Sequence, residues 1–289
     1  MIMNIKYIKK VKNICGRPGV ALALVKQKIS GGDMKTFAMR GFVSMVLVLV
    51  LSGGAFAAIP LITDDTGTQG KGNFQLELFG EYGHDREEIV TTKTSDISLT
   101  LTYGIIDTVD IMLGVPYEAW STSGSGSGSA KGDGFGDVSL EAKWRLYEKD
   151  DLSLALKPGF TIPTGDADKN LGAGRPTYHL LLLATKKMKP WQFDMNIGYL
   201  YNENTGGTRK NIWSASVDAQ CEVVKDLKLV LDTGVATNPD SSSDTPPVYI
   251  LGGLIWSVRE NLDIGLGIKG GLTKPETDIA IRGGITWRF

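Results

Sequence analysis

Apolar and polar residues alternate along most of the chain from residue 74 to the end. In the first such segment Phe74, Leu76 and Leu78 alternate with Gln75 and Glu77. A period of two is typical of a β-strand with one apolar and one polar face. The pattern predicts strands over residues 74–82, 97–103, 109–117, 138–145, 152–162, 178–184, 191–201, 213–223, 227–235, 248–258, 262–272 and 279–289. No apolar run after residue 58 approaches the length of about 20 residues that a membrane-spanning helix needs.

The connections between these strands alternate in length along the whole chain. Short turns fall at residues 106–107, 148–151, 186–190, 225–226 and 259–261. Longer polar loops fall at residues 83–94, 121–134, 164–176, 202–210, 237–246 and 273–278. Short turns on one side, long loops on the other and an even number of strands are typical of bacterial outer-membrane barrels.

Aromatic residues on the apolar rows gather at both ends of the strands, as expected for rings at two membrane interfaces. Those at the short-turn ends are Tyr103, Trp144, Trp191, Trp256 and Trp287, and those at the long-loop ends are Tyr82, Tyr117, Phe160, Tyr178, Tyr199, Tyr201 and Trp213. We therefore predict an all-β fold, a transmembrane antiparallel up-and-down β-barrel of about 12 strands over residues 73–289, surrounded by outer-membrane lipid. The first strand should pair with the last, because an open edge in lipid would leave backbone groups unpaired.

The first 57 residues predict an export signal. Residues 34–57 combine a short basic region, an apolar core of eleven residues and a small-x-small cleavage site at Ala55 and Ala57. This is the layout of a signal peptide handled by the general secretion translocon, and the core is too short for a membrane anchor. The mature chain is expected to begin at Ala58. Residues 1–33 fit neither a barrel nor a signal, and we interpret them as an upstream extension from a misassigned start codon, with Met34 as the true start.

The expected mature chain, without residues 1–57, is more acidic than the full chain. Residues 1–57 hold nine of the 31 basic residues and one of the 32 acidic ones, so their removal moves the formal charge from -1 to -9. An acidic mature chain is a poor candidate for nucleic-acid binding, which needs a basic patch. Of the two cysteines, Cys15 lies in the removed segment, so the mature protein has no disulfide. Cys221 lies on a predicted lipid-facing row.

Several motifs resemble a known family of bacterial outer-membrane proteins, described as transporters of the MetA pathway of phenol degradation. They are residues 60–68 (PLITDDTGT), 70–72 (GKG), 134–137 (GFGD), 163–166 (PTGD), 171–175 (LGAGR) and 287–289 (WRF). The resemblance covers essentially all of residues 58–289 and implies a barrel with a transport role. The terminal Ile285, Trp287 and Phe289 also look like the signal that the barrel-assembly machinery reads.

Charged residues of both signs occupy the inward positions of the predicted strands. The candidates for lining the lumen are Glu77, Glu141, Lys143, Arg145, Lys157, Asp194, Asp218, Glu222, Asp232, Lys269 and Arg282. They could select solutes by charge in an open channel, or they could form a ladder of ion pairs that fills a narrow interior. Small barrels are packed with side chains and large ones are open, and twelve strands fall between these cases.

Residues 58–72 precede the first strand and form a periplasmic N-terminal segment or a plug. Thr63, Asp64 and Asp65 could fold into the lumen and bind a solute, or they could form an Asx-type turn that leads into the barrel; composition favours the turn. Asp133, Asp137, Asp166 and Asp168 lack the spacing of a calcium loop. We predict no metal site and no cofactor.

An enzyme finds little support in the sequence. The two histidines, His84 in the first long loop and His179 on an inward position, would have to combine with a serine and a carboxylate, and no nucleophile elbow, metal helix or phosphate loop is present. We predict no catalytic residue. The leading hypothesis is a passive pore-type transporter of an unknown small solute, with aromatic and apolar compounds as candidates. The alternatives are a structural or surface-interaction barrel with a closed lumen and, after it, an outer-membrane hydrolase.

Overall fold

The computed structural model describes residues 59–87, 90–124 and 127–289. The expected signal peptide and upstream extension lie outside these residues. The strands are β1 (Phe74–Glu87), β2 (Val90–Ile106), β3 (Val109–Gly124), β4 (Ser127–Phe135), β5 (Val138–Lys149), β6 (Leu152–Ile162), β7 (Thr177–Met188), β8 (Trp191–Tyr201), β9 (Asn211–Val224), β10 (Leu227–Ala236), β11 (Val248–Arg259), β12 (Leu262–Gly271) and β13 (Ile279–Arg288). The loop after β6 carries a short 3-10 helix, Ala167–Lys169. Among these residues, no helix has the length and apolar character needed to cross a membrane.

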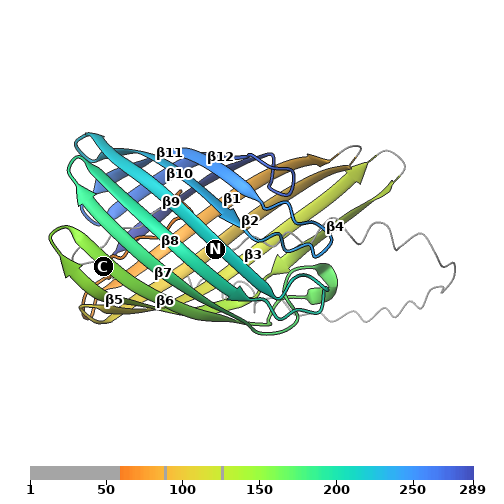
Figure 1. Ribbon diagram of the computed structural model, residues 1–289, viewed down its shortest axis with the longest axis horizontal. Coiled ribbons are helices and arrows are strands. Elements are labelled where there is room, and N and C mark those ends of the chain that lie inside the picture. The colour runs from red at the N-terminus through yellow and green to blue at the C-terminus, as the bar shows by residue number, and fades with distance from the viewer. Residues whose placement is uncertain (1–58, 88–89, 125–126) are drawn as a thin grey trace, which may run out of the picture.

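The strands form one closed antiparallel barrel, as predicted (Figure 1). β1 pairs with β13 from Gln75 opposite Arg288 to His84 opposite Ile279. Reciprocal backbone hydrogen bonds of 2.7 and 2.9 Å between Phe74 and Phe289 close the short-turn end. No strand edge is therefore left for the lipid, in which unpaired backbone groups cost several kcal/mol each.

β4 and β5 together occupy one strand position, so the closed barrel has twelve positions. β5 pairs with the inner half of β3, from Val109 to Gly114, and β4 pairs with its outer half, from Tyr117 to Gly124. The chain leaves the ladder between them at Gly136, whose N–H donates to the Pro116 carbonyl at 3.0 Å. The even strand number and the alternation of short and long connections agree with the prediction.

Two of the predicted long loops are largely strand, and here the sequence-based prediction was wrong. β1 and β2 continue through most of residues 83–94, and β3 and β4 pair through most of residues 121–134. Both hairpins project beyond the long-loop end of the barrel (Figure 1). Above the membrane neither face of a strand has to be apolar, so backbone pairing continues there without the alternation on which the prediction relied.

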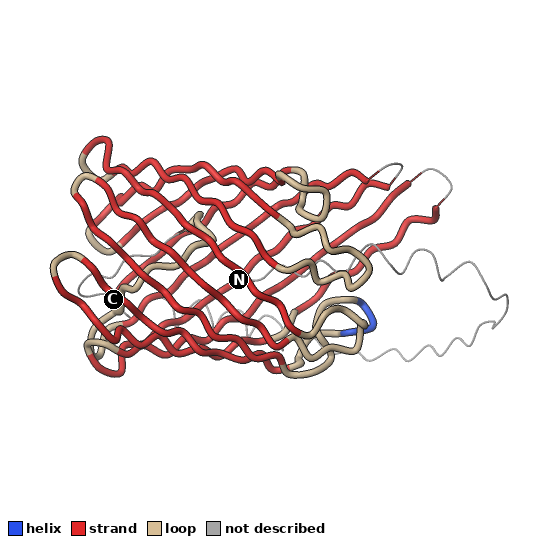
Figure 2. Tube along the Cα trace, viewed as in Figure 1, coloured by secondary structure: helices blue, strands red, loops and turns tan. Residues whose placement is uncertain are grey.

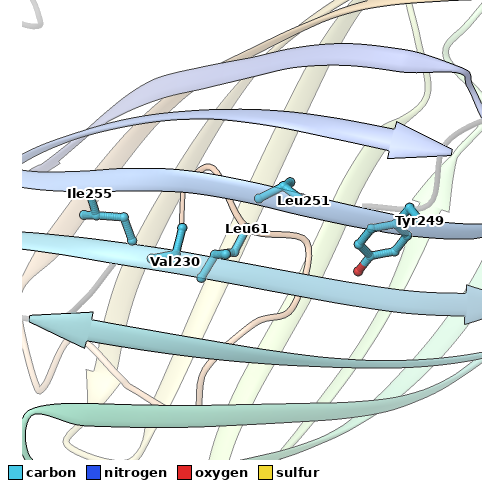
Figure 3. Close-up of a cluster of buried hydrophobic side chains, with 5 residues drawn as sticks. All are labelled: Leu61, Val230, Tyr249, Leu251 and Ile255. Atoms are coloured by element: carbon cyan, nitrogen blue, oxygen red, sulfur yellow. The ribbon is translucent and has the colours of Figure 1, made fainter. Parts of the chain in front are cut away.

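The exposed large apolar side chains follow the predicted lipid-facing rows. Examples are Leu78, Ile97, Leu180, Leu231 and Ile281, each between 46% and 53% exposed. The barrel is thus apolar on the outside, and its buried positions lie mostly inside the lumen. One apolar cluster is found there, where Leu61 packs against Val230, Tyr249, Leu251 and Ile255 of β10 and β11 (Figure 3).

Candidate functional site

Residues 59–73, called the N-terminal segment from here on, run along the inside of the barrel. Its first residues lie in a groove lined by inward glycines of β11, β12 and β13. A Cβ at Gly265 would overlap the Ile59 carbonyl, and a Cβ at Gly253 or Gly267 would lie 2.9 or 2.8 Å from the Pro60 ring. Side chains at these positions would therefore prevent the segment from lying against the wall.

Inward polar side chains bind the rest of the segment. The N–H groups of Ile62 and Thr63 donate to Oδ2 of Asp232 at 2.6 and 2.8 Å, and the Thr63 hydroxyl donates to Oδ1 at 2.8 Å. The N–H of Thr66 donates to the Thr185 hydroxyl at 3.0 Å. The segment thus passes from β10 toward β7 with its backbone donors satisfied by the wall.

The far end of the segment reaches β3. The N–H of Gln69 donates to both carboxylate oxygens of Asp110, at 2.9 and 3.1 Å. Oδ1 of Asp65 accepts the N–H of Gly67 at 2.7 Å, which is the Asx-type bond of a turn. Residues 63–67 therefore lie inside the lumen and also contain a turn.

Asp64 bridges two lysines of the barrel wall. Lys143 on β5 and Lys157 on β6 donate to its two carboxylate oxygens at 2.8 and 3.0 Å, and Lys143 also lies 3.8 Å from Asp65. Burial by itself would raise the pKa of Asp64, but the two lysines outweigh it and hold that pKa below its usual range. Burial raises the pKa of Asp65, and Lys143 only partly offsets this.

The network continues through Glu141 to His179. Oε2 of Glu141 lies 3.2 Å from Lys157, and Oε1 lies 2.8 Å from Nε2 of His179 on β7. Gly159 of β6 lies between Glu141 and His179 in the sheet. A Cβ at Gly159 would come within 2.5 Å of the His179 ring, so the glycine makes room for this contact across a strand.

A second group of ion pairs covers the β1, β12 and β13 wall. Glu81 lies 3.5 Å from Lys269 and 3.2 Å from Arg282, and Lys269 also pairs with Glu276 at 2.9 Å. The Arg282 guanidinium lies 4.8 Å from the centre of the Phe79 ring. These charges neutralise one another at positions that are nearly fully buried.

A cavity of about 480 Å³ runs inside the lumen. The residues that line it extend from Thr94 and Thr277 toward the extracellular end to Thr102 and Asp110 toward the short-turn end. None of its described lining residues belongs to β10, β11 or β12, where the N-terminal segment covers the wall. The segment itself contributes Asp64 and Gln69 to the lining.

The predicted lumen-lining residues fall into three groups. Glu77, Glu141, Lys143, Lys157 and Arg282 line the cavity, as do Thr63 and Asp64 of the N-terminal segment. Asp194, Asp218, Asp232 and Lys269 point inward but are buried away from it. Arg145 pairs with Glu148 at 3.1 Å near the short turn after β5, and Glu222 is exposed near the turn after β9.

The three aspartates of the second group lie side by side on neighbouring strands. Asp218 is directly opposite both Asp194 and Asp232 in the sheet. Asp194 accepts hydrogen bonds from Gln192 and Gln220, whereas no described residue donates to the Asp218 carboxylate. No group of three or more histidine, cysteine, aspartate or glutamate side chains within the described ranges is arranged to hold a metal ion.

Sequence reasoning missed five acidic residues that line the cavity: Asp85, Asp96, Asp110, Glu118 and Glu276. Asp110 lies between the apolar Val109 and Ile111, in the alternation already used to predict the strand. Asp96 and Glu118 each lie one residue outside a predicted strand. Asp96 and Glu118 were missed because the strand boundaries were drawn too short, whereas Asp110 lies within a predicted strand and could have been included. Asp85 and Glu276 lie in predicted loops, where alternation gives no signal.

A closed antiparallel barrel with an apolar outer face and an interior that holds many charged and polar side chains is the architecture of a bacterial outer-membrane β-barrel. The chain belongs to the family described as "Putative MetA-pathway of phenol degradation", whose model matches residues 60–289.

Solved structures support the same fold. The COG4313 outer membrane channel from Pseudomonas putida F1 matches with a TM-score of 0.64 and 16% identity over 83% of this chain and 100% of that one. The KdgM porin matches with a TM-score of 0.51 and 8% identity over 74% of this chain and 99% of that one. A comparison with curated proteins finds no match.

Proposed function

We propose that the barrel is a passive channel that admits small solutes across the outer membrane without a nucleotide or a metal. The observation that carries the proposal is the cavity of about 480 Å³, because side chains would fill a purely structural barrel of this size. Its lining on β1–β3 combines polar side chains with apolar ones such as Phe79 and Met112, and its lining on β7–β9 includes the apolar Leu181, Leu200 and Ile212. A solute with a polar group and an apolar or aromatic body could form hydrogen bonds with the polar lining residues and pack against the apolar ones.

A buried hydroxyl gives further support. Thr102 on β2 is 3% exposed and lines the cavity, and no described residue forms a hydrogen bond with its Oγ1. Buried polar groups nearly always have a partner. A water molecule or a solute group within the cavity would supply it.

The test is single-channel recording on protein purified from the outer membranes of a Gram-negative host that expresses the full chain. We expect discrete conductance steps in a planar bilayer, reduced by small aromatic alcohols added from either side. A correctly folded barrel that stays electrically silent and gives no liposome swelling with such solutes would refute the proposal.

The silent outcome would favour a surface-interaction barrel. The two hairpins project above the barrel (Figure 1). They and the exposed side chain of Phe135, at the end of β4, are the features on which such a function would rest. Deleting the tips of both hairpins would then abolish binding to cells or surfaces while the barrel still folds.

A further inference from the structure

The positive charges that face the cavity from the barrel wall are already neutralised. Lys143 and Lys157 bind Asp64, and Lys157 also binds Glu141. Arg282 pairs with Glu81. Lys274, the remaining cation among the described lining residues, belongs to the loop between β12 and β13.

Two carboxylates on the opposite wall form no ion pair with a described lysine or arginine. Asp96 on β2 and Glu118 on β3 lie directly opposite each other and both line the cavity. Asp96 is also directly opposite Glu81 on β1, so three carboxylates follow one another across the sheet. Of the three, only Glu81 forms an ion pair with a described lysine or arginine. Like charges at directly opposite positions destabilise a sheet, so a cation in the cavity would relieve the repulsion.

The same wall also contains a buried polar side chain without a hydrogen-bond partner among the described residues. Thr102 lies on β2 on the same face as Asp96, and its buried hydroxyl has no partner among the described residues. Glu77 lies opposite Thr100, the previous inward residue of β2, and no ion pair within the described ranges involves it. The β1–β3 wall therefore carries acidic side chains, those of Glu77, Asp96 and Glu118 among them, that form no ion pair with a described lysine or arginine, beside apolar residues of the same lining.

We propose that the channel is cation-selective and that Asp96 and Glu118 are its specificity-determining residues. The favoured solutes are small organic cations, such as amines with an apolar or aromatic body, over carboxylates of the same size. Low-dielectric walls focus the field of uncompensated charges into the aqueous path, so the carboxylates raise the local concentration of cations and lower that of anions. The inference rests on the proposed function, because it requires a conducting lumen.

The experiment measures the reversal potential of single channels in a tenfold KCl gradient, using full-length protein purified from outer membranes. The variants are Asp96→Asn, Glu118→Gln and the double variant. Asp168→Asn is the matched control, because Asp168 is an acid of an extracellular loop that does not line the cavity. Liposome swelling with benzylammonium chloride and with sodium benzoate compares two solutes of similar size and opposite charge.

We expect the wild-type channel to prefer cations and to admit benzylammonium faster than benzoate. Each single substitution should lower the cation-to-anion permeability ratio about twofold, because salt only partly screens a carboxylate that lines a narrow lumen and its remaining field acts oppositely on the two ions. The control should keep the wild-type ratio. A conducting channel that prefers anions, or whose ratio is the same in all variants, would overturn the selectivity proposal alone. A folded channel that neither conducts nor swells liposomes would overturn the proposed function and this inference together.

Discussion

Replacing Asp64 by asparagine should loosen the N-terminal segment from the barrel wall. The side chains of Lys143 and Lys157 are 8% and 11% exposed and that of Asp64 is 25% exposed. The bridge is therefore intermediate between an exposed ion pair, worth about 0–1 kcal/mol, and a buried one, whose breakage costs about 3–5 kcal/mol. We expect docking of the segment to lose about 2 kcal/mol, which raises its undocked population about 30-fold.

Amide hydrogen exchange measures this population directly. The N–H groups of Ile62, Thr63 and Gln69 are bonded to Asp232 and Asp110 of the wall, so they exchange when the segment undocks. In Asp64→Asn their exchange should accelerate about 30-fold, while peptides from β8 and β9 keep their wild-type protection. Asp166→Asn, which removes an exposed loop ion pair, is the control. Unchanged exchange across residues 59–73 would show that the lysine bridge does not hold the segment, and the reasoning would fail.

Three further changes test the packing of the segment and of the charge network. Gly265→Val should expel residues 59–60 from their groove, because the valine side chain would occupy the space of the Ile59 carbonyl. Proteolysis near the N-terminus should then become faster than in the control Gly252→Val, where a Cβ meets no atom within 4 Å. The hydroxyl oxygens of Thr63 and Ser216 are 2.9 Å apart, so cysteines in place of both residues, in a Cys221→Ser background, should form a disulfide. Single-channel conductance should be the same before and after this disulfide is reduced. A larger conductance after reduction would instead identify the segment as a moving gate. Gly159→Ala should separate His179 from Glu141 and shift the histidine ring resonances in NMR spectra, whereas unchanged resonances would contradict the contact.

The membrane-spanning part of the fold could be predicted because lipid and lumen impose opposite requirements on alternate residues. Positions that face the lipid, such as those of Leu78, Ile97 and Ile281, must be apolar, and this requirement produces the alternation seen in the sequence. The outer ends of β1–β4 are strands for a different reason, which is continued backbone pairing. Pairing beyond the membrane leaves no periodic signal, and the prediction therefore ended these strands too early.

The charges of the lumen could be listed from the sequence, but their partners could not. Asp64 is 79 residues from Lys143 and 93 from Lys157, and only the path of the N-terminal segment brings the three together. That path depends on inward glycines such as Gly253 and Gly265, which a search for alternation treats as gaps in a strand. A row of inward glycines on neighbouring strands is a signal that could have identified a groove for another part of the chain.

The N-terminal segment makes the two sides of the lumen different. It covers β10–β12 and buries Asp232 beneath it, so these strands contribute no described residue to the lining of the cavity. It also places Asp64 where it neutralises the lysines of β5 and β6, while Asp96 and Glu118 on the far wall form no ion pair with a described lysine or arginine. A barrel without the segment would have a wider lumen in which Lys143 loses its carboxylate partners and Lys157 keeps only Glu141. The same fifteen residues therefore set both the width of the path and the sign of its charge, and changes in Asp64 should alter ion preference and solute size limit together.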